Sequence, residues 1–163
     1  MNRRILIVGC PGSGKSTFAR RLAEKTGIPL YHLDALYWRA DRTHLTREEL
    51  IDVLTPIIQT DEWIIDGNYN STMPLRVGYC TELILLDYPV DVCLNGVRAR
   101  MGTSRPDMPW VETQEDPVFM DFIRAYPDTS RPRVFALMAD HPDKRFTIFR
   151  TRDDAERYLA QQG

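Results

Sequence analysis

The sequence predicts a single α/β domain in which a parallel β-sheet is covered by helices on both faces. The length of 163 residues fits one hydrophobic core. Short apolar blocks typical of buried strands alternate with helical patterns, and this alternation indicates βαβ units and a parallel sheet. A glycine-rich turn directly follows the first block. The expected strands are residues 5–8, 29–33, 63–65, 83–86 and 146–149.

Four helices are expected between and after these strands. The first carries an apolar stripe and stops at Gly27. The second begins with Thr46 in a capping box, and we expect Pro56 to kink or shorten it. The third is expected to be capped by Asp91, and the last to open near Thr151 with acidic residues at its positive end.

Composition excludes several classes of function. The formal net charge is −2, so no overall positive field attracts a nucleic acid or an anionic membrane, and we expect neither partner. No apolar run is long enough for a signal peptide or a membrane span. The cysteines are odd in number and widely spaced, which favours a reducing compartment, the cytoplasm. They are Cys10, Cys80 and Cys93.

The turn after the first strand has the form of a phosphate-binding loop. Residues 9–17 read G-C-P-G-S-G-K-S-T, which matches G-x-x-x-x-G-K-[ST] between a strand and a helix. Its glycines let backbone N–H groups face phosphate oxygens, Lys15 reaches the β- and γ-phosphates, and Ser16 binds Mg²⁺. We therefore expect ATP and Mg²⁺ as ligands. The expected nucleotide contacts here are Gly9, Pro11, Gly12, Ser13, Gly14, Lys15, Ser16 and Thr17.

Three predicted strands end in aspartate: Asp34, Asp66 and Asp87. Ligands of parallel sheets bind beyond the carboxyl ends of the strands, so one of these carboxylates is expected on the Mg²⁺ side. Asp87 follows the longer apolar run and is favoured by simple pattern, but Asp66 is preferred because Gly67 and Asn68 permit a close turn beside a ligand. Asp34 is a candidate base for a substrate hydroxyl, although a cap in a loop is the alternative. His32 is interpreted as a structural histidine.

Arginines near a segment rich in turn formers, residues 102–109, indicate a lid that closes over phosphate. Arg105 lies within this segment, and Arg100 lies just before it. Arg76 follows the Asp66 turn by ten residues and is expected to hold the acceptor. The alternative is a solvated basic face for Arg100 and Arg105 and a surface ion pair for Arg76.

Taken together, the motifs resemble one family over nearly the whole chain. H-L-D-A-L-Y-W at 32–38, W-I-I-D-G-N-Y at 63–69, L-L-D-Y-P at 85–89 and S-R-P-D-M at 104–108 join the phosphate loop in this pattern. It resembles the adenylate-kinase-like P-loop proteins called DNA topology modulation proteins, or FlaR-related proteins. The resemblance implies a three-layer P-loop NTPase fold with a five-stranded parallel sheet ordered 2-3-1-4-5, of the nucleoside-monophosphate-kinase type. It also implies a substrate-binding segment at about 35–62 and a lid at about 102–117.

The resemblance also implies roles for single residues. The D-G turn of related kinases serves metal and acceptor, which supports Asp66 and Gly67. Asp34 matches the second-strand aspartate of shikimate- and gluconate-type kinases, which act on hydroxyls. Arg152, with Arg150 beside it, lies where the base-side loop of the family packs on the nucleotide ring. The turn reads D-G-N-Y rather than the D-G-F-P-R of adenylate kinase, so AMP is not supported as acceptor.

These observations favour an ATP-dependent kinase that moves the γ-phosphate to an unidentified small-molecule or nucleotide acceptor. The expected catalytic residues are Lys15, Asp34, Asp66 and Arg105; Asp34, Gly67, Asn68 and Arg76 are expected to bind the acceptor. The alternatives are a nucleotide-dependent regulator or NTPase acting on DNA, and a scaffold that binds nucleotide without turnover. Monomer and dimer are both left open.

Overall fold

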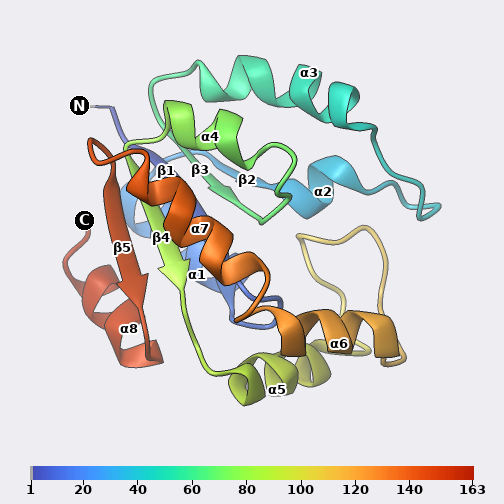
Figure 1. The fold of residues 1–163 in the computed structure, drawn as a ribbon. Coiled ribbons are helices and arrows are strands. Elements are labelled where there is room, and N and C mark those ends of the chain that lie inside the picture. Colours follow the sequence, from blue (N-terminus) through green and yellow to red (C-terminus); the bar gives the residue numbers. More distant parts are fainter. Residues whose placement is uncertain (1) are drawn as a thin grey trace.

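The structure is a computed structural model that describes residues 2–163. Five strands form one parallel sheet in the order β2-β3-β1-β4-β5, as the sequence and the resemblance predict (Figure 1). The strands are β1 (Arg4–Gly9), β2 (Leu30–His32), β3 (Trp63–Asp66), β4 (Glu82–Leu86) and β5 (Arg145–Phe149). Within the described residues, no helix is long and apolar enough to cross a bilayer.

Eight helices connect and flank the strands in residues 2–163. They are α1 (Lys15–Thr26), α2 (Leu33–Tyr37), α3 (Arg47–Ile58), α4 (Met73–Tyr79), α5 (Val90–Arg100), α6 (Pro117–Ala125), α7 (Ser130–Ala139) and α8 (Arg152–Ala160). Alternate residues of β1 face opposite layers. Ile5 and Ile7 pack in one core with α1, α5, α6 and α8, whereas Leu6 and Val8 pack in the other with α3, α4 and α7. The fold is therefore the expected three-layer α/β architecture.

Most helix ends lie where the sequence predicts them. Gly27 ends α1 in a left-handed conformation (φ 72°). Capping boxes at Thr46 and Thr151 begin α3 and α8. The cap expected at Asp91 is wrong: Pro89 is the N-cap of α5, and Asp91 lies in the first turn, where its charge still faces the positive helix end.

The sequence analysis missed four helices, α2, α4, α6 and α7. β2 stops at His32, and the chain enters α2 at Leu33 instead of continuing the strand. α6 begins with Asp116, whose carboxylate accepts from the N–H groups of Val118 and Phe119, followed by a proline in the first turn. This start signal is present in the sequence, but the many prolines after residue 100 hid it.

Candidate active site

The phosphate-binding loop lies between β1 and α1 at the carboxyl edge of the sheet. Gly12 and Gly14 adopt positive φ angles of 84° and 95°. Gly14 is the N-cap of α1 and provides no side-chain cap, so the first N–H groups of the helix have no side-chain acceptor there. A Cβ atom on Gly12 would collide with the Cys93 carbonyl, and one on Gly96 would collide with the Gly12 carbonyl. Helix α5 thus packs directly against the backbone of the loop and fixes its position.

Lys15 bends back over this loop. Its Nζ donates to the carbonyls of Gly9 at 3.0 Å and Cys10 at 3.3 Å. Burial lowers the pKa of Lys15, while the negative charges of Asp34 and Asp66 act in the opposite direction. The ammonium is therefore bound to two loop carbonyls and lies within the electrostatic influence of two carboxylates.

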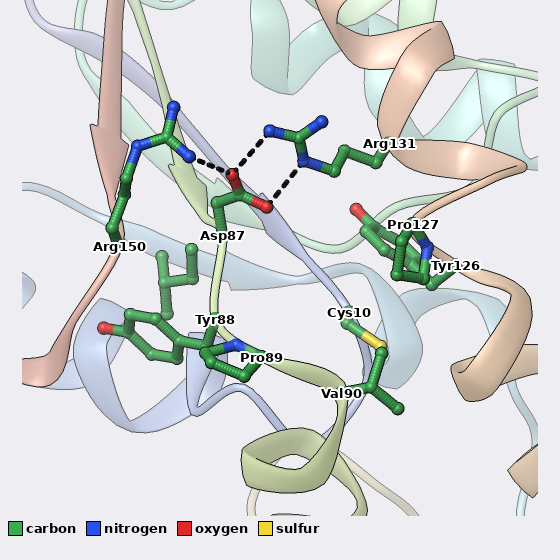
Figure 2. Close-up of a pocket in the computed structure, with 10 residues that line it drawn as sticks. Cys10, Asp87, Tyr88, Pro89, Val90, Tyr126, Pro127, Arg131 and Arg150 are labelled. Carbon is green, nitrogen blue, oxygen red and sulfur yellow. Dashed lines mark hydrogen bonds and ion pairs between the residues drawn. The ribbon is translucent and has the colours of Figure 1, made fainter.

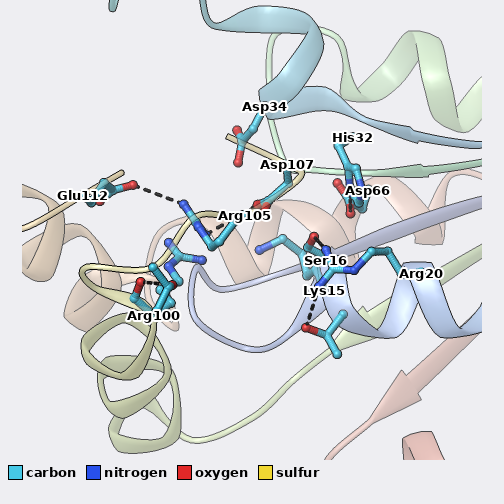
Figure 3. A network of polar contacts seen from close by, with 12 residues as sticks. Lys15, Ser16, Arg20, His32, Asp34, Asp66, Arg100, Arg105, Asp107 and Glu112 are labelled. Atoms are coloured by element: carbon cyan, nitrogen blue, oxygen red, sulfur yellow. Dashed lines mark hydrogen bonds and ion pairs between the residues drawn. The ribbon is translucent and has the colours of Figure 1, made fainter. Parts of the chain in front are cut away.

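Asp66 and His32 form a pair at the carboxyl ends of β3 and β2. Asp66 is 5% exposed, and its Oδ2 lies 2.6 Å from His32 Nδ1. Burial acts to lower the pKa of His32, but the hydrogen bond and charge of Asp66 outweigh it, so that the pKa is raised. Figure 3 shows Asp66 and His32 beside Ser16 and Lys15. The paired role of His32 agrees with its structural interpretation.

Asp34 lies in the first turn of α2 and is half-buried. The hydroxyl of Tyr69 donates to its Oδ1. Burial raises the pKa of Asp34, against the lowering effects of Tyr69 and Lys15. A carboxylate with a raised pKa near a reacting hydroxyl is suited to accept a proton. The sequence analysis did not identify Tyr69.

Asp87 occupies a different environment from Asp66. Its oxygens accept from Arg131 Nε at 2.8 Å and Nη2 at 3.0 Å, and from Arg150 Nη1 at 3.0 Å (Figure 2). It lines a separate pocket of about 340 Å³ together with Cys10, Tyr88 and Tyr126. Both Asp87 oxygens are engaged with arginines, whereas Asp66 Oδ1 accepts no hydrogen bond within residues 2–163. Asp66 is thus the better candidate for the metal side.

In the turn after β3, two side chains that were expected to contact the substrate bind backbone groups of the protein. Asn68 exchanges two hydrogen bonds with the Gly9 backbone, Gly9 N to Oδ1 at 3.2 Å and Nδ2 to Gly9 O at 2.8 Å. Arg76 has no exposed surface, and its guanidinium donates to the carbonyls of Gly67, Asn68 and Tyr69. Arg76 Nε also donates to the Thr72 hydroxyl at 3.2 Å. Both side chains therefore hold the turn in place, and the acceptor contact expected of them stays a prediction.

Position 67 requires glycine because the backbone there lies close to the Leu33 side chain. The φ angle of Gly67 is 131°, and a Cβ atom there would lie 2.7 Å from Leu33 Cβ. Its N–H donates to the Ile7 carbonyl of β1 at 3.0 Å. Gly67 therefore fixes the position of Asp66 against the sheet, a role that sequence spacing alone did not reveal.

The expected lid begins after α5, and residues 101–116 form no helix or strand. Gly102 N donates to the Glu112 carbonyl at 2.6 Å and closes the loop on itself. Arg105 lies 3.5 Å from Asp107 and 3.3 Å from Glu112, and its side chain is 15% exposed. Arg100 Nε is buried without a hydrogen-bond partner in the described residues. Burial lowers the pKa of Arg100, and the nearby charge of Arg105 adds to this effect.

Two further contacts frame the site. The Arg152 guanidinium lies 5.7 Å from the Tyr88 ring centroid and approaches the position that a side chain on Gly14 would take. Arg152 thus lies beside Gly14 at the end of the phosphate loop, and its role on the base side stays a prediction. Trp110 of the lid segment packs edge-on against Trp38, with ring centroids 5.4 Å apart. The lid segment therefore touches the segment expected to bind substrate.

The residues present fit a magnesium ion that is shared with phosphate. Residues 2–163 contain no group of three or more His, Cys, Asp or Glu side chains placed to hold a metal. Mg²⁺ keeps several waters and commonly takes one or two protein oxygens plus phosphates. Ser16 Oγ, which accepts from Arg20 at 2.6 Å, and the free oxygen of Asp66 could supply this pair.

Comparisons with known proteins give matching results. A sequence family described as "ATPase family associated with various cellular activities (AAA)" matches residues 5–65. Adenylate kinase of Thermotoga neapolitana is 32% identical over 88 residues, which cover 52% of this chain and 39% of that enzyme. The chain therefore matches about two fifths of the length of its curated relatives.

Solved structures match over almost the full length. Shikimate kinase from Bacteroides thetaiotaomicron has a TM-score of 0.65 at 19% identity, covering 99% of this chain and 96% of that chain. A gluconokinase from Sinorhizobium meliloti 1021 has a TM-score of 0.59 at 16% identity, covering 98% and 93%. This chain has the fold of the P-loop kinases. The sequence resemblance is supported at this level, that of an adenylate-kinase-like P-loop protein.

Proposed function

We propose that the protein is a Mg²⁺- and ATP-dependent phosphotransferase that acts on a hydroxyl group of a small molecule. The observation that carries this proposal is the arrangement around Lys15. The phosphate loop and Lys15 lie between two carboxylates, Asp34 and Asp66, and the lid arginines Arg100 and Arg105 (Figure 3). Phosphoryl transfer needs positioning and charge stabilisation, and this arrangement supplies both. The kinase names of the matched proteins support the same reaction type.

In this proposal the loop N–H groups and Lys15 bind the β- and γ-phosphates. Arg100 and Arg105 neutralise the charge of the transferring group, and their closely placed charges favour a polyanion between them. Mg²⁺, held through Ser16 and Asp66, would offset phosphate charge. Arg152 would lie against the nucleotide base.

The acceptor side is proposed to contain Asp34. Asp34 accepts the proton of the acceptor hydroxyl, the hydroxyl oxygen bonds to the γ-phosphorus, and the bond from this phosphorus to the β–γ bridging oxygen breaks. ADP leaves with the electron pair of that bond. Tyr69 orients the Asp34 carboxylate through its hydroxyl. Gly67, Asn68 and Arg76 hold the turn that positions Asp66 and Tyr69.

The net charge of −2 supplies no positive field for a nucleic acid, so the charge of the protein does not favour action on DNA. The resemblance to DNA topology modulation proteins supports this alternative by name only. For location we propose the cytoplasm, which is supported by three buried cysteines that form no disulfide in the described structure.

The test compares matched variants for Mg²⁺-ATP binding by calorimetry and for ADP release. Lys15→Ala should abolish ADP release while leaving the fold intact, whereas Lys25→Ala, on the exposed end of the same helix, should match the parent. Asp66→Asn should weaken the dependence on Mg²⁺, whereas Asp87→Asn should not. Full ADP release by Lys15→Ala, or no detectable Mg²⁺-ATP binding by the parent, would falsify the proposal.

A further inference from the structure

We propose that the phosphoryl acceptor is a hydroxyl compound without negative charge, an amino sugar or amino alcohol rather than an acid or a phosphate ester, and that Asp107 binds its donor groups together with Asp34. This inference rests on the proposed function and defines its acceptor. Asp107 comes from the lid segment and was not among the site residues expected from the sequence.

Asp107 is a buried carboxylate with an unused oxygen. Its residue is 5% exposed, and its side chain is 7% exposed. Arg105 lies 3.5 Å from Oδ2, but Oδ1 is buried and has no hydrogen-bond partner among residues 2–163. A buried carboxylate oxygen without a donor is costly, so a ligand that supplies a hydrogen-bond donor would bind favourably to Asp107 Oδ1.

The unused oxygen belongs to the reaction site. Figure 3 shows the Asp107 carboxylate between Asp34 and Arg105, on the side that faces Lys15. Its charge acts on both Asp34 and His32 and contributes to raising the pKa of each. Two carboxylates therefore face the same space from opposite elements, α2 and the lid segment. A molecule bound between them must offer hydrogen-bond donors.

The cations of the acceptor side are already engaged. Residues 35–76 contain four arginines and no lysine. Arg39 pairs with Glu49, Arg42 lies over the Trp110 ring, Arg47 donates to the Ser71 carbonyl, and Arg76 is buried on backbone carbonyls. Within the described structure, three of these arginines bind protein oxygens, and the fourth, Arg42, lies over the lid-segment Trp110 and is shown in no contact with Asp34 or Asp107.

The remaining cations are paired or face the nucleotide. His32 pairs with Asp66, and Arg20 donates to the hydroxyls of Ser16 and Thr17. Lys15, Arg100 and Arg105 face the phosphate loop, and a bound triphosphate would occupy them. An acceptor carboxylate or phosphate would then meet Asp34 and Asp107 without a counter-charge, which disfavours its binding. An ammonium or several hydroxyl groups would instead satisfy Asp107 Oδ1 and separate the two negative charges. The charge distribution thus selects a non-anionic acceptor.

The experiment uses the full chain with Mg²⁺-ATP and compounds matched on one ring, namely glucose, glucosamine, glucuronate and glucose 6-phosphate. Ethanolamine and glycolate form a small pair, since both carry a free hydroxyl group and only glycolate is anionic. ADP release gives kcat and KM for each. We expect turnover of non-anionic members only, with the amino member of each scaffold preferred. A higher kcat/KM for an anionic member overturns the inference, as does failure of every compound while Mg²⁺-ATP still binds. Loss of Mg²⁺-ATP binding would instead overturn the proposed function.

Asp107→Asn then tests the residue itself. Removing a charged hydrogen-bond acceptor should raise the KM of the accepted compound about tenfold or more, with a smaller change in the KM for ATP. Glu115→Gln is the matched control, a lid-segment carboxylate that pairs with Arg98 at the surface, and it should leave the acceptor KM unchanged. Glu112→Gln removes the other carboxylate from Arg105. If Glu112→Gln raises the acceptor KM as much as Asp107→Asn, Asp107 acts only through Arg105 and the assignment is wrong.

Discussion

Asn68 provides a direct test of how the turn after β3 supports the phosphate loop. Asn68→Ala removes both hydrogen bonds to the Gly9 backbone. The Gly9 carbonyl keeps a donor, because Lys15 Nζ also binds it at 3.0 Å. The Gly9 N–H loses its side-chain acceptor in a buried position. Leaving such a donor unpaired costs about 1–3 kcal/mol, so we expect a loss of about 2 kcal/mol in the free energy of unfolding.

For a domain of this size, that loss lowers Tm by about 4–8 °C. The measurement is thermal and urea unfolding without ligand, followed by Mg²⁺-ATP affinity, which should also fall because the loop is less well held. Asn70→Ala is the control, since Asn70 is exposed in the same turn and its side chain makes no hydrogen bond within the described residues. An unchanged Tm for Asn68→Ala, with only an acceptor KM raised, would refute this reasoning and restore Asn68 as an acceptor contact.

Three further predictions concern residues that hold the site. Gly12→Ala forces a Cβ into the α5 carbonyl at a positive φ, so its urea midpoint should fall, whereas Gly78→Ala, in open space on α4, should be neutral or stabilising. His32 has a folded pKa raised above 6.5 by Asp66; its stabilisation is complete below pH 6.5 and is lost as pH rises through the folded value. In EDTA, unfolding free energy should therefore fall with pH more steeply in the parent than in His32→Gln, and equal slopes would contradict the pairing. Arg76→Ala should lose about 3 kcal/mol or more by urea unfolding, because three carbonyls lose their donor; an unchanged midpoint would show that water replaces it.

The strands of the parallel sheet and the phosphate loop were predictable because their signals are local, whereas the strand order came from the family resemblance. Strand residues such as Ile64 and Ile65 are apolar on both sides because helices cover both faces of the sheet. The loop needs glycine at fixed spacing because its backbone curls and lies against α5. Each of these requirements produces a recognisable pattern within a few residues of sequence. Helices α6 and α7 have weaker sequence patterns, because prolines 117, 127 and 132 suggest loops. Two of these prolines, 117 and 132, in fact lie in the first turns of the helices.

The roles of polar residues were harder to assign because they depend on partners distant in the sequence. Asn68 was expected on the acceptor because it lies in the turn that follows Asp66, but its partner is Gly9, 59 residues away. Arg76 has the residue type of a phosphate ligand and yet serves backbone carbonyls. Asp107 stood within a motif that the resemblance used, without any role. Residue type identified the chemistry at this edge, and tertiary contacts decided which groups remain available.

This distinction also divides the polar residues at the carboxyl edge of the sheet. Asp87, Asn68 and Arg76 have their hydrogen-bonding groups engaged by other parts of the chain, so they contribute to stability in the absence of ligand. Asp107 and Arg100 each keep a buried atom without a partner, and such atoms destabilise the folded protein until a ligand pairs with them. In the proposed function, Asp107 Oδ1 would pair with the phosphoryl acceptor and Arg100 Nε with the nucleotide. The two ligands would therefore contact one loop segment and the end of α5 that precedes it.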